Sequence, residues 1–314
     1  MKLTPPPRSV AHAGLRALKT ICLTAKKDLS DLQTQFILGV QKHILDTNFS
    51  LESLDPISPL ELATIVTDGE LKDRIIRACI ITGCIDGSMD GVEVQKIEEF
   101  AKALNVDMNP INTAWKLANR HLILARADIV RKSLPGVKVK QIAQKDGVFA
   151  VLKQFLPMLG MEMTEVTARY RKLKDYPMGT LGKEFIHYIN KNKFPLPGEK
   201  GAGPEIIVTH DCLHILGDYG TSATEEIEVA AFQAGCQTGD PLYGLLFGLA
   251  QYHLGIQVAP VAPPEQLQAN PEKMIAAFAR GCRMKRDMWT DFNPWDHFTK
   301  QVDALRDDLG VIPK

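Results

Sequence analysis

The chain of 314 residues lacks features that mark several specialised classes of protein. Its 37 basic and 37 acidic side chains cancel, so the excess positive charge that attracts a protein to nucleic acid is missing. No run of about 18 consecutive apolar residues occurs, and we therefore expect no membrane-spanning helix. The amino terminus has no apolar segment typical of a secretory signal. These absences predict a globular protein that does not bind nucleic acid.

The six cysteines are scattered, and no two of them form a C-x-x-C pair. This spacing predicts reduced thiols in a cytosolic type of compartment. Cys212 lies inside a histidine motif described below. At helical spacing it points away from His210, so we expect it to pack behind that motif rather than to bind a metal ion.

The hydrophobic pattern is helical almost throughout the chain. Apolar residues recur at the i, i+3, i+4 and i+7 spacing of an amphipathic helix, for example at Val94, Ile97, Phe100 and Leu104. Strand-like and helix-like segments do not alternate, so a parallel sheet is not expected. The sequence therefore predicts an all-α protein.

The chain is too long for one compact helical domain, which predicts two. Pro135 and Gly136 interrupt the helical pattern, and the domain boundary is placed there. The predicted organisation is a basic N-terminal arm over residues 1–30, a helical domain over 31–133, a Pro/Gly linker over 134–145 and a second helical domain over 146–314. The first 27 residues carry six lysines or arginines and no acid. They suit a membrane-facing arm, an organellar presequence or a helix packed on its own domain.

Three local features predict where helices of the second domain begin. Thr180 should cap a helix that runs to about Asn190, and Thr209 should cap the helix that carries the histidine motif. Asn293-Pro294 should open a last helix through Leu309.

An acidic turn in the first domain partly matches a calcium-binding loop. Asp86, Ser88, Asp90 and Gly91 fit the first half of an EF-hand, but the twelfth position is Ile97 where a bidentate Glu is required. The sequence therefore favours a turn between two helices in which Asp90 caps the second helix.

The strongest chemical signal is the pattern H-D-x-x-H-x11-E, formed by His210, Asp211, His214 and Glu226. On a helix, His210 and His214 share one face, and the turn 217–220 allows a second helix to bring Glu226 back toward them. Two imidazoles and two carboxylates suit a divalent cation, whose charge the two carboxylates would neutralise. The pattern predicts a metal centre with these four residues as ligands and catalytic group. Zinc is favoured, with magnesium or iron as alternatives.

An HD-type phosphohydrolase is a competing interpretation of part of this pattern. Such an enzyme pairs an upstream His with a His-Asp doublet and a later Asp, roles that His187, His210, Asp211 and Asp240 would fill. This assignment leaves His214 and Glu226 without a function.

Residues 145–314 resemble the coenzyme Q (ubiquinone) biosynthesis protein 4 family. Besides the four residues of the metal pattern, the resemblance rests on Gly-Thr-Leu-Gly-Lys at 179–183, Ala-Arg-Gly-Cys-Arg at 279–283, and Trp295 with the segment 302–311. One departure is Thr224-Glu225, where a small residue is expected before Glu226, and we expect Glu225 to point away from the centre. The resemblance implies an all-helical protein whose metal ion is held by His210, Asp211, His214 and Glu226. It also implies oxidative decarboxylation of polyprenylated benzoates at ring carbon 1, which replaces the carboxylate by a hydroxyl group.

Residues 30–133 resemble the TerB-like helical domain of tellurite-resistance proteins. The segment 78–87 carries the resemblance, with Asp90 and Glu93 after it. A fused domain of this kind indicates a bacterial protein, and we expect it to be an interaction or membrane-proximal module.

The leading expectation is a metal-dependent decarboxylase of ubiquinone biosynthesis. Arg169, Lys183 or Arg283 should hold the substrate carboxylate, and the glycine-interrupted helix 242–256 either lines a channel for the prenyl tail or is buried core. A non-catalytic prenyl-lipid-binding scaffold with a structural metal ion is the alternative, followed by the phosphohydrolase. Expected partners are a polyprenylated aromatic lipid, a membrane surface, other ubiquinone-biosynthesis enzymes and a second copy of the chain. The expected location is the bacterial cytoplasm, at the inner membrane where the substrate lies.

Overall fold

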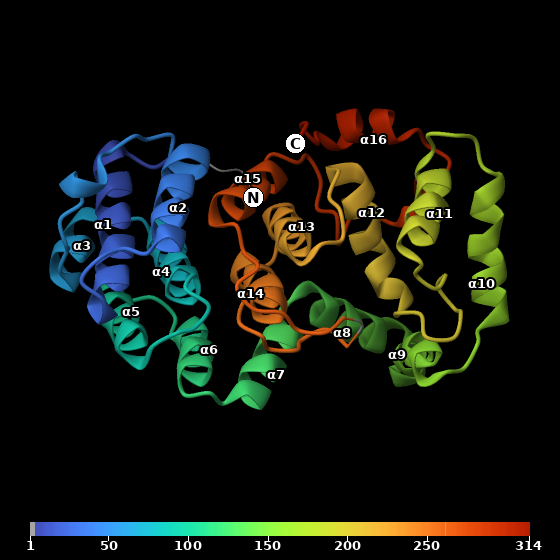
Figure 1. Cartoon of the computed structure of the whole chain (residues 1–314), viewed down its shortest axis with the longest axis horizontal. Coiled ribbons are helices and arrows are strands. Elements are labelled where there is room, and N and C mark those ends of the chain that lie inside the picture. The colour runs from blue at the N-terminus through green and yellow to red at the C-terminus, as the bar shows by residue number, and fades with distance from the viewer. Residues whose placement is uncertain (1–3, 261) are drawn as a thin grey trace.

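The structure is a computed structural model that describes residues 4–260 and 262–314, and these ranges contain helices and no strand. The predicted all-α fold is therefore confirmed. Figure 1 shows α1–α6 at one end, α9–α12 at the other, and α13–α15 between them. The α-helices are α1 Arg8–Ala25, α2 Asp31–Val40, α3 Pro59–Ile65, α4 Gly69–Cys84, α5 Gly91–Leu104, α6 Asn109–Ala118, α7 Leu122–Lys132, α8 Leu134–Asp146, α9 Val148–Phe155, α10 Thr164–Arg171, α11 Leu181–Asn192, α12 Val208–Gly217, α13 Ala223–Gly235, α14 Pro241–Tyr252, α15 Pro271–Cys282 and α16 Val302–Leu309.

Two of the predicted helix caps are confirmed. The Thr180 hydroxyl accepts a hydrogen bond from the backbone N–H of Lys183 at the start of α11. Asp90 caps α5, and Glu93 completes a capping box by accepting from the Asp90 N–H. The acidic turn before α5 is thus a connection between two helices, as predicted.

Two other predicted helix starts are wrong. Thr209 is not a cap, because α12 begins at Val208 and continues from the 3-10 turn η5 (Glu205–Ile207). Asn293 caps only the 3-10 turn η6 (Pro294–Asp296), and α16 begins later, at Val302. The segment between them cannot be helical because its carbonyl groups at Phe298 and Lys300 accept hydrogen bonds from the first N–H groups of α11.

The Pro/Gly linker predicted over residues 134–145 is also wrong, because these residues form the helix α8. Pro135 lies in the first turn of that helix, where an N–H group has no helical partner to lose. Gly136 lies so close to the end of α7 that a Cβ there would be 2.2 Å from the Val130 carbonyl oxygen. The interruption in the hydrophobic pattern therefore marks a tight α7–α8 junction at Ser133.

From Arg8 to Ala25 the basic N-terminal segment is a packed helix rather than an arm. Helix α1 buries Leu15, Leu18 and Ile21 in the core of the first half of the molecule. Its Arg16 donates to Glu61 at 2.6 Å, and its Lys19 donates to the Leu51 carbonyl at 2.7 Å. Of the three interpretations drawn from the sequence, a helix packed on its own domain matches this arrangement.

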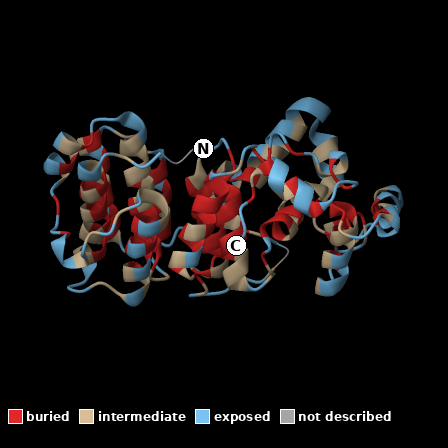
Figure 2. Cartoon of the chain, turned by 90° about the horizontal axis from the view of Figure 1, so that it is seen from above, coloured by how far each residue is buried: buried red, intermediate tan, exposed pale blue. Residues whose placement is uncertain are grey.

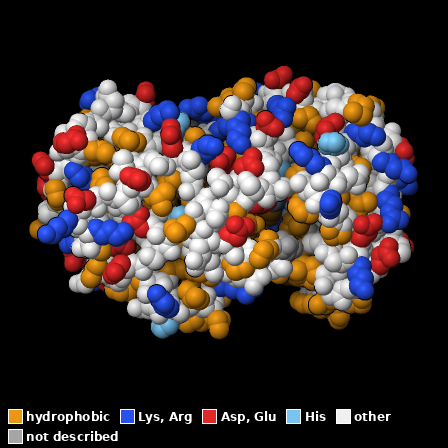
Figure 3. All heavy atoms as spheres, in the orientation of Figure 1, with side chains coloured by type: hydrophobic (Ala, Val, Ile, Leu, Met, Phe, Trp, Pro, Cys, Tyr) orange, Lys and Arg blue, Asp and Glu red, His pale blue; other side chains and the backbone are white. Residues whose placement is uncertain are grey.

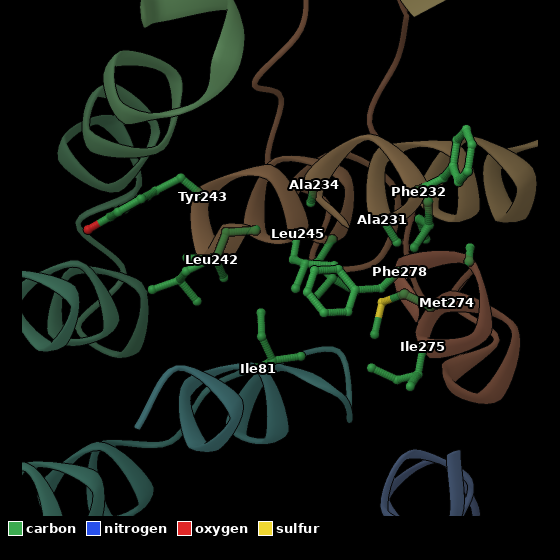
Figure 4. Close-up of a cluster of buried hydrophobic side chains, with 14 of the residues drawn as sticks. Ile81, Ala231, Phe232, Ala234, Leu242, Tyr243, Leu245, Met274, Ile275 and Phe278 are labelled. Atoms are coloured by element: carbon green, nitrogen blue, oxygen red, sulfur yellow. The ribbon is translucent and has the colours of Figure 1, made fainter. Parts of the chain in front are cut away.

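The two halves of the molecule pack together through apolar side chains. Ile81 of α4 points toward Leu242 and Leu245 of α14 (Figure 4). Helices α2 and α15 approach so closely that a Cβ at Gly39 would lie 3.2 Å from the Cα of Glu272. Figure 2 shows buried residues in the first half and continuing through the centre of the molecule. The halves therefore share a continuous hydrophobic core.

Neither disulfides nor a membrane-spanning segment contribute to this fold. All six cysteines are buried and free, Cys212 among them on the inner side of α12. None of the helices in the described ranges has both the length and the apolar character needed to span a bilayer.

Helices α13 and α15 are in backbone contact at two glycines. A Cβ at Gly281 would lie 2.0 Å from the Phe232 carbonyl oxygen, and one at Gly235 would lie 2.3 Å from that of Phe278. No side chain can be accommodated at either point without moving a helix. The position of α13, which carries Glu226, is therefore set by its contact with α15.

We predict that Gly281→Ala destabilises the protein by about 1–3 kcal/mol, because the added methyl group forces α13 and α15 apart. The midpoint of thermal unfolding should fall by a few degrees. Gly69→Ala is the matched control, since a Cβ at this helical position has nothing within 4 Å. Equal midpoints for the two variants would show that the close approach of the helices contributes no stability.

Candidate metal centre

The candidate centre is built by two consecutive helices and the turn between them. His210 and His214 lie one turn apart on α12, and Glu226 lies in the first turn of α13. Asp218 ends α12 in the left-handed conformation, with φ of 58°. Glu225 points away from the centre, as predicted, and accepts hydrogen bonds from the Gly220 N–H at 3.0 Å and the Ser222 hydroxyl at 2.8 Å. These bonds hold the turn that brings Glu226 back over α12.

The donor atoms of His210, His214 and Glu226 converge. The Nε2 atoms of the two imidazoles are 3.1 Å apart. Glu226 Oε2 lies 3.4 Å from His210 Nε2, and Oε1 lies 3.6 Å from His214 Nε2. Two nitrogens bound to one tetrahedral zinc ion at about 2.0–2.1 Å are separated by about 3.3 Å. The spacing of these three donors thus fits a single divalent ion.

The opposite nitrogen of each imidazole is held by a carbonyl oxygen. His210 Nδ1 donates to Gln233 Oε1 at 2.8 Å, and His214 Nδ1 donates to the Gly220 carbonyl at 2.9 Å. If both rings were neutral, their Nε2 lone pairs would face each other, and this repulsion is removed by a proton on one ring or by a metal ion between them. Metal-bound histidines are commonly oriented by such hydrogen bonds from the second ring nitrogen.

The electrostatics of the cluster also favour a bound positive charge. Burial, with the neighbouring His210, lowers the pKa of His214 to about 4. Burial opposes protonation of His210 as well, but its hydrogen bond to Glu226 and the charge of that carboxylate outweigh burial and raise its pKa to about 9. Burial would raise the pKa of Glu226, yet its two histidine neighbours lower it. A cation at this position therefore meets an ionised carboxylate and a neutral imidazole.

Asp211 is the one predicted ligand that lies outside this group. The three ligand atoms of His210, His214 and Glu226 all lie within 4.8 Å of one another, and Asp211 contributes none of them. Asp211 lines the same pocket, and burial raises the pKa of its carboxyl group to about 7, against the effect of His210. The role of Asp211 as a fourth ligand stays a prediction.

Two cavities meet at the centre. All four predicted residues line a pocket of about 640 Å³. A smaller cavity of about 140 Å³ shares His210 and Glu226 with it and is otherwise mainly apolar. His210 and Glu226 therefore lie between the large pocket on one side and the smaller apolar cavity on the other.

Helix α14 ends at Tyr252, contributes to the buried core and lines a cavity, while its role as a channel for a prenyl tail stays a prediction. Its Leu246 and Leu249 are buried, while Gly244, Phe247 and Gly248 line the smaller cavity. The glycines also admit α13, since a Cβ at Gly248 would lie 2.9 Å from the Cβ of Ala230. The glycine-interrupted pattern thus reflects close helix packing beside a cavity.

Three residues at the centre were missed in the sequence. Gln233 orients His210, while Tyr188 and Tyr252 line the large pocket. The Tyr188 ring lies over His214 with centroids 5.4 Å apart, and burial raises the pKa of both phenols far above the usual value. The spacing of Gln233, seven residues after Glu226 and so on the same face of a helix, is a signal that could have identified it. No comparable signal marks the tyrosines.

The predicted carboxylate-binding cations lie elsewhere. Arg169 pairs with Glu205 at 2.6 Å, Lys183 donates to the Lys174 carbonyl at 2.5 Å, and Arg283 is exposed. Within residues 4–260 and 262–314, the walls of the two cavities contain no lysine or arginine.

The residues of the phosphohydrolase pattern are not assembled. His187 is exposed on α11 and does not line the pocket that contains His210 and Asp211. Asp240 caps α14 and accepts from Arg77 Nε at 2.9 Å.

No protein-family model matches this sequence, and no curated protein sequence matches it significantly. The resemblance to the ubiquinone-biosynthesis family therefore stays a prediction from the sequence.

We predict that His214→Ala loses the divalent ion. The substitution removes a buried imidazole ligand, and water cannot take its place without rearrangement of the site. Elemental analysis of purified protein should find metal in the wild type and little in the variant. His187→Ala, an exposed histidine on a neighbouring helix, should keep the wild-type content. Full metal content in His214→Ala would refute the ligand assignment.

Proposed function

We propose that the protein is a metal-dependent decarboxylase that acts on a polyprenylated hydroxybenzoate in ubiquinone biosynthesis and replaces the ring carboxylate by a hydroxyl group. One observation carries the proposal: the converging donors of His210, His214 and Glu226 line a large pocket, and two of them, His210 and Glu226, also line an adjoining apolar cavity. A polar reacting ring with an apolar tail matches this arrangement. The resemblance of the C-terminal half to the ubiquinone-biosynthesis family supports the same reaction.

The donor set would hold a divalent ion through His210, His214 and Glu226, with Asp211 as the expected fourth ligand. Zinc is favoured by the nitrogen-rich set, and iron or magnesium are alternatives. When bound, such an ion supplies Lewis-acid stabilisation of negative charge on an oxygen.

The substrate carboxylate should be oriented toward the centre. Because the described walls of both cavities contain no lysine or arginine, no other cationic side chain there can compensate its charge. Tyr188 and Tyr252 remain protonated, so each can donate a hydrogen bond to the ring substituents. Tyr188 also holds one face of His214 and limits the movement of that imidazole.

The ring and tail would divide between the two cavities. A pocket of about 640 Å³ is within the usual size for a small-molecule site, whereas about 140 Å³ accommodates only a short apolar segment. The wall formed by Ala230 and Ala234 on α13 and by Gly244 and Phe247 on α14 offers that segment no hydrogen-bonding side chain.

The overall conversion has a defined balance. Replacing an aryl carboxylic acid by a phenol with water as the oxygen source releases carbon dioxide, two protons and two electrons. The ring supplies the two electrons, and dioxygen from the air accepts them. Zinc has no redox activity, so with zinc the acceptor must react with the substrate directly.

The test is incubation of metal-loaded protein in air with a polyprenylated methoxy-hydroxybenzoate, followed by mass spectrometry. We expect loss of carbon dioxide and gain of a hydroxyl group, and we expect Glu226→Ala to reduce turnover at least 100-fold, a loss within the usual range for a transition-state contact. His187→Ala should remain active. Substrate that co-purifies unchanged with the metal-loaded wild type would contradict the enzyme and favour a prenyl-lipid carrier, for which the apolar cavity is the supporting observation.

A further inference from the structure

Helix α9 is apolar, and its residues are exposed or half-buried. It contains two phenylalanines, two valines and a leucine in eight residues, yet none of its residues is buried. Phe149 is 82% exposed, Val148 65% and Leu152 56%. Figure 3 shows hydrophobic side chains gathered at the lower right edge of the molecule, where Figure 1 places α9. Large apolar side chains left in water on one short helix mark an interaction surface.

The apolar surface continues beyond α9. The 3-10 turn η3 (Pro157–Leu159) follows it, and Leu159 is 73% and Met161 48% exposed. Helices α8 and α9, with the turn η3 after them, pack together along the edge of the molecule (Figure 1). We call residues 134–161 the edge unit.

The charge of the same segment is one-sided. Residues 131–160 contain six lysines or arginines and one acid, in a chain whose net charge is zero. Lys140, Lys145 and Lys153 are exposed, and none of them forms an ion pair with any described residue. Exposed apolar residues flanked by unpaired lysines are the composition of helices that lie in the headgroup region of anionic bilayers.

The edge unit also borders both cavities of the metal centre. Met158 of η3 lines the large pocket, and the Pro157 carbonyl accepts from the N–H of Gly201, another residue of that pocket. At the other end of the unit, Leu134 and Pro135 line the smaller apolar cavity. A surface in contact with lipid would therefore lie beside the walls through which an apolar substrate must pass.

We propose that the edge unit is a docking surface for a membrane that carries anionic lipids, with Val148, Phe149 and Leu152 inserted among the headgroups and Lys145 and Lys153 against lipid phosphates. A second copy of this chain would bring the same excess of lysines to the contact and be repelled, whereas an anionic bilayer complements it. The docking stands on exposure and charge alone. Its use in admitting a prenylated lipid to the pocket rests on the proposed function.

The first test measures the binding of the full chain to vesicles by sedimentation. Vesicles of phosphatidylcholine alone are compared with vesicles that contain phosphatidylglycerol, at low and high salt. We expect the wild type to bind the anionic vesicles and to be released by salt. Phe149→Ser with Leu152→Ser should raise the lipid concentration for half-binding at least tenfold. Leu60→Ser on α3, which replaces a side chain that is 77% exposed, should bind as the wild type does.

The second test reverses charge. Lys145→Glu with Lys153→Glu should remove the preference for anionic vesicles, while Lys191→Glu, an exposed lysine on α11, should keep it. Unchanged metal content in every variant shows that the fold of the centre is intact. The proposal is overturned if the wild type ignores anionic vesicles or if Phe149→Ser with Leu152→Ser binds them equally well. It is also overturned if sedimentation shows that the wild type is a dimer and that only Phe149→Ser with Leu152→Ser is a monomer.

The two proposals fail separately. Vesicle binding with no turnover of the benzoate would retain the docking surface and reject the decarboxylase. Turnover of a short-chain benzoate by a protein that does not bind vesicles would retain the decarboxylase and reject the docking surface.

Discussion

The candidate site depends on two imidazole nitrogens that face each other across 3.1 Å with a carboxylate beside them. Each ring is turned into that position by a hydrogen bond at its other nitrogen, from His210 to Gln233 and from His214 to the Gly220 carbonyl. The raised pKa of His210 places a proton on this ring when no metal ion is bound, and a metal ion would take the place of that proton between the two nitrogens. The hydrogen bonds around the two rings therefore hold them in the orientation that a metal site requires.

The rest of the fold holds the two helices that carry these groups. Arg280 of α15 is buried and donates to the Gly217 carbonyl at the end of α12 and to the Ile312 carbonyl, both at 2.6 Å. The glycine contact between α13 and α15 positions Glu226 from the other side. The first half of the molecule reaches the site region through His253, whose Nε2 lies 2.8 Å from the Ile85 carbonyl oxygen. Packing and buried hydrogen bonds, rather than covalent cross-links, hold the metal-ligand atoms of His210, His214 and Glu226 in place.

The sequence predicted the elements whose signals are local and left out those that depend on distant contacts. The i, i+4 spacing of His210 and His214, the return of Glu226 and the caps at Thr180 and Asp90 all follow from nearest neighbours on a helix. The linker prediction failed because Pro135 has the same composition signal in a first helical turn as in a loop. The start of α16 was misplaced because the carbonyl groups before it are occupied by α11, a contact between residues more than 100 positions apart. The tyrosines of the pocket and the absence of cationic side chains from its described walls likewise depend on tertiary structure.

The central claim is that His210, His214 and Glu226 bind one divalent ion together. X-ray absorption spectroscopy of the zinc-loaded full chain tests it most directly, because it reports the atoms bound to the metal. We predict a four-coordinate ion with two imidazole nitrogens at about 2.0–2.1 Å and carboxylate oxygen at about 2.0–2.2 Å. A spectrum dominated by sulfur, or by oxygen without imidazole, would contradict it.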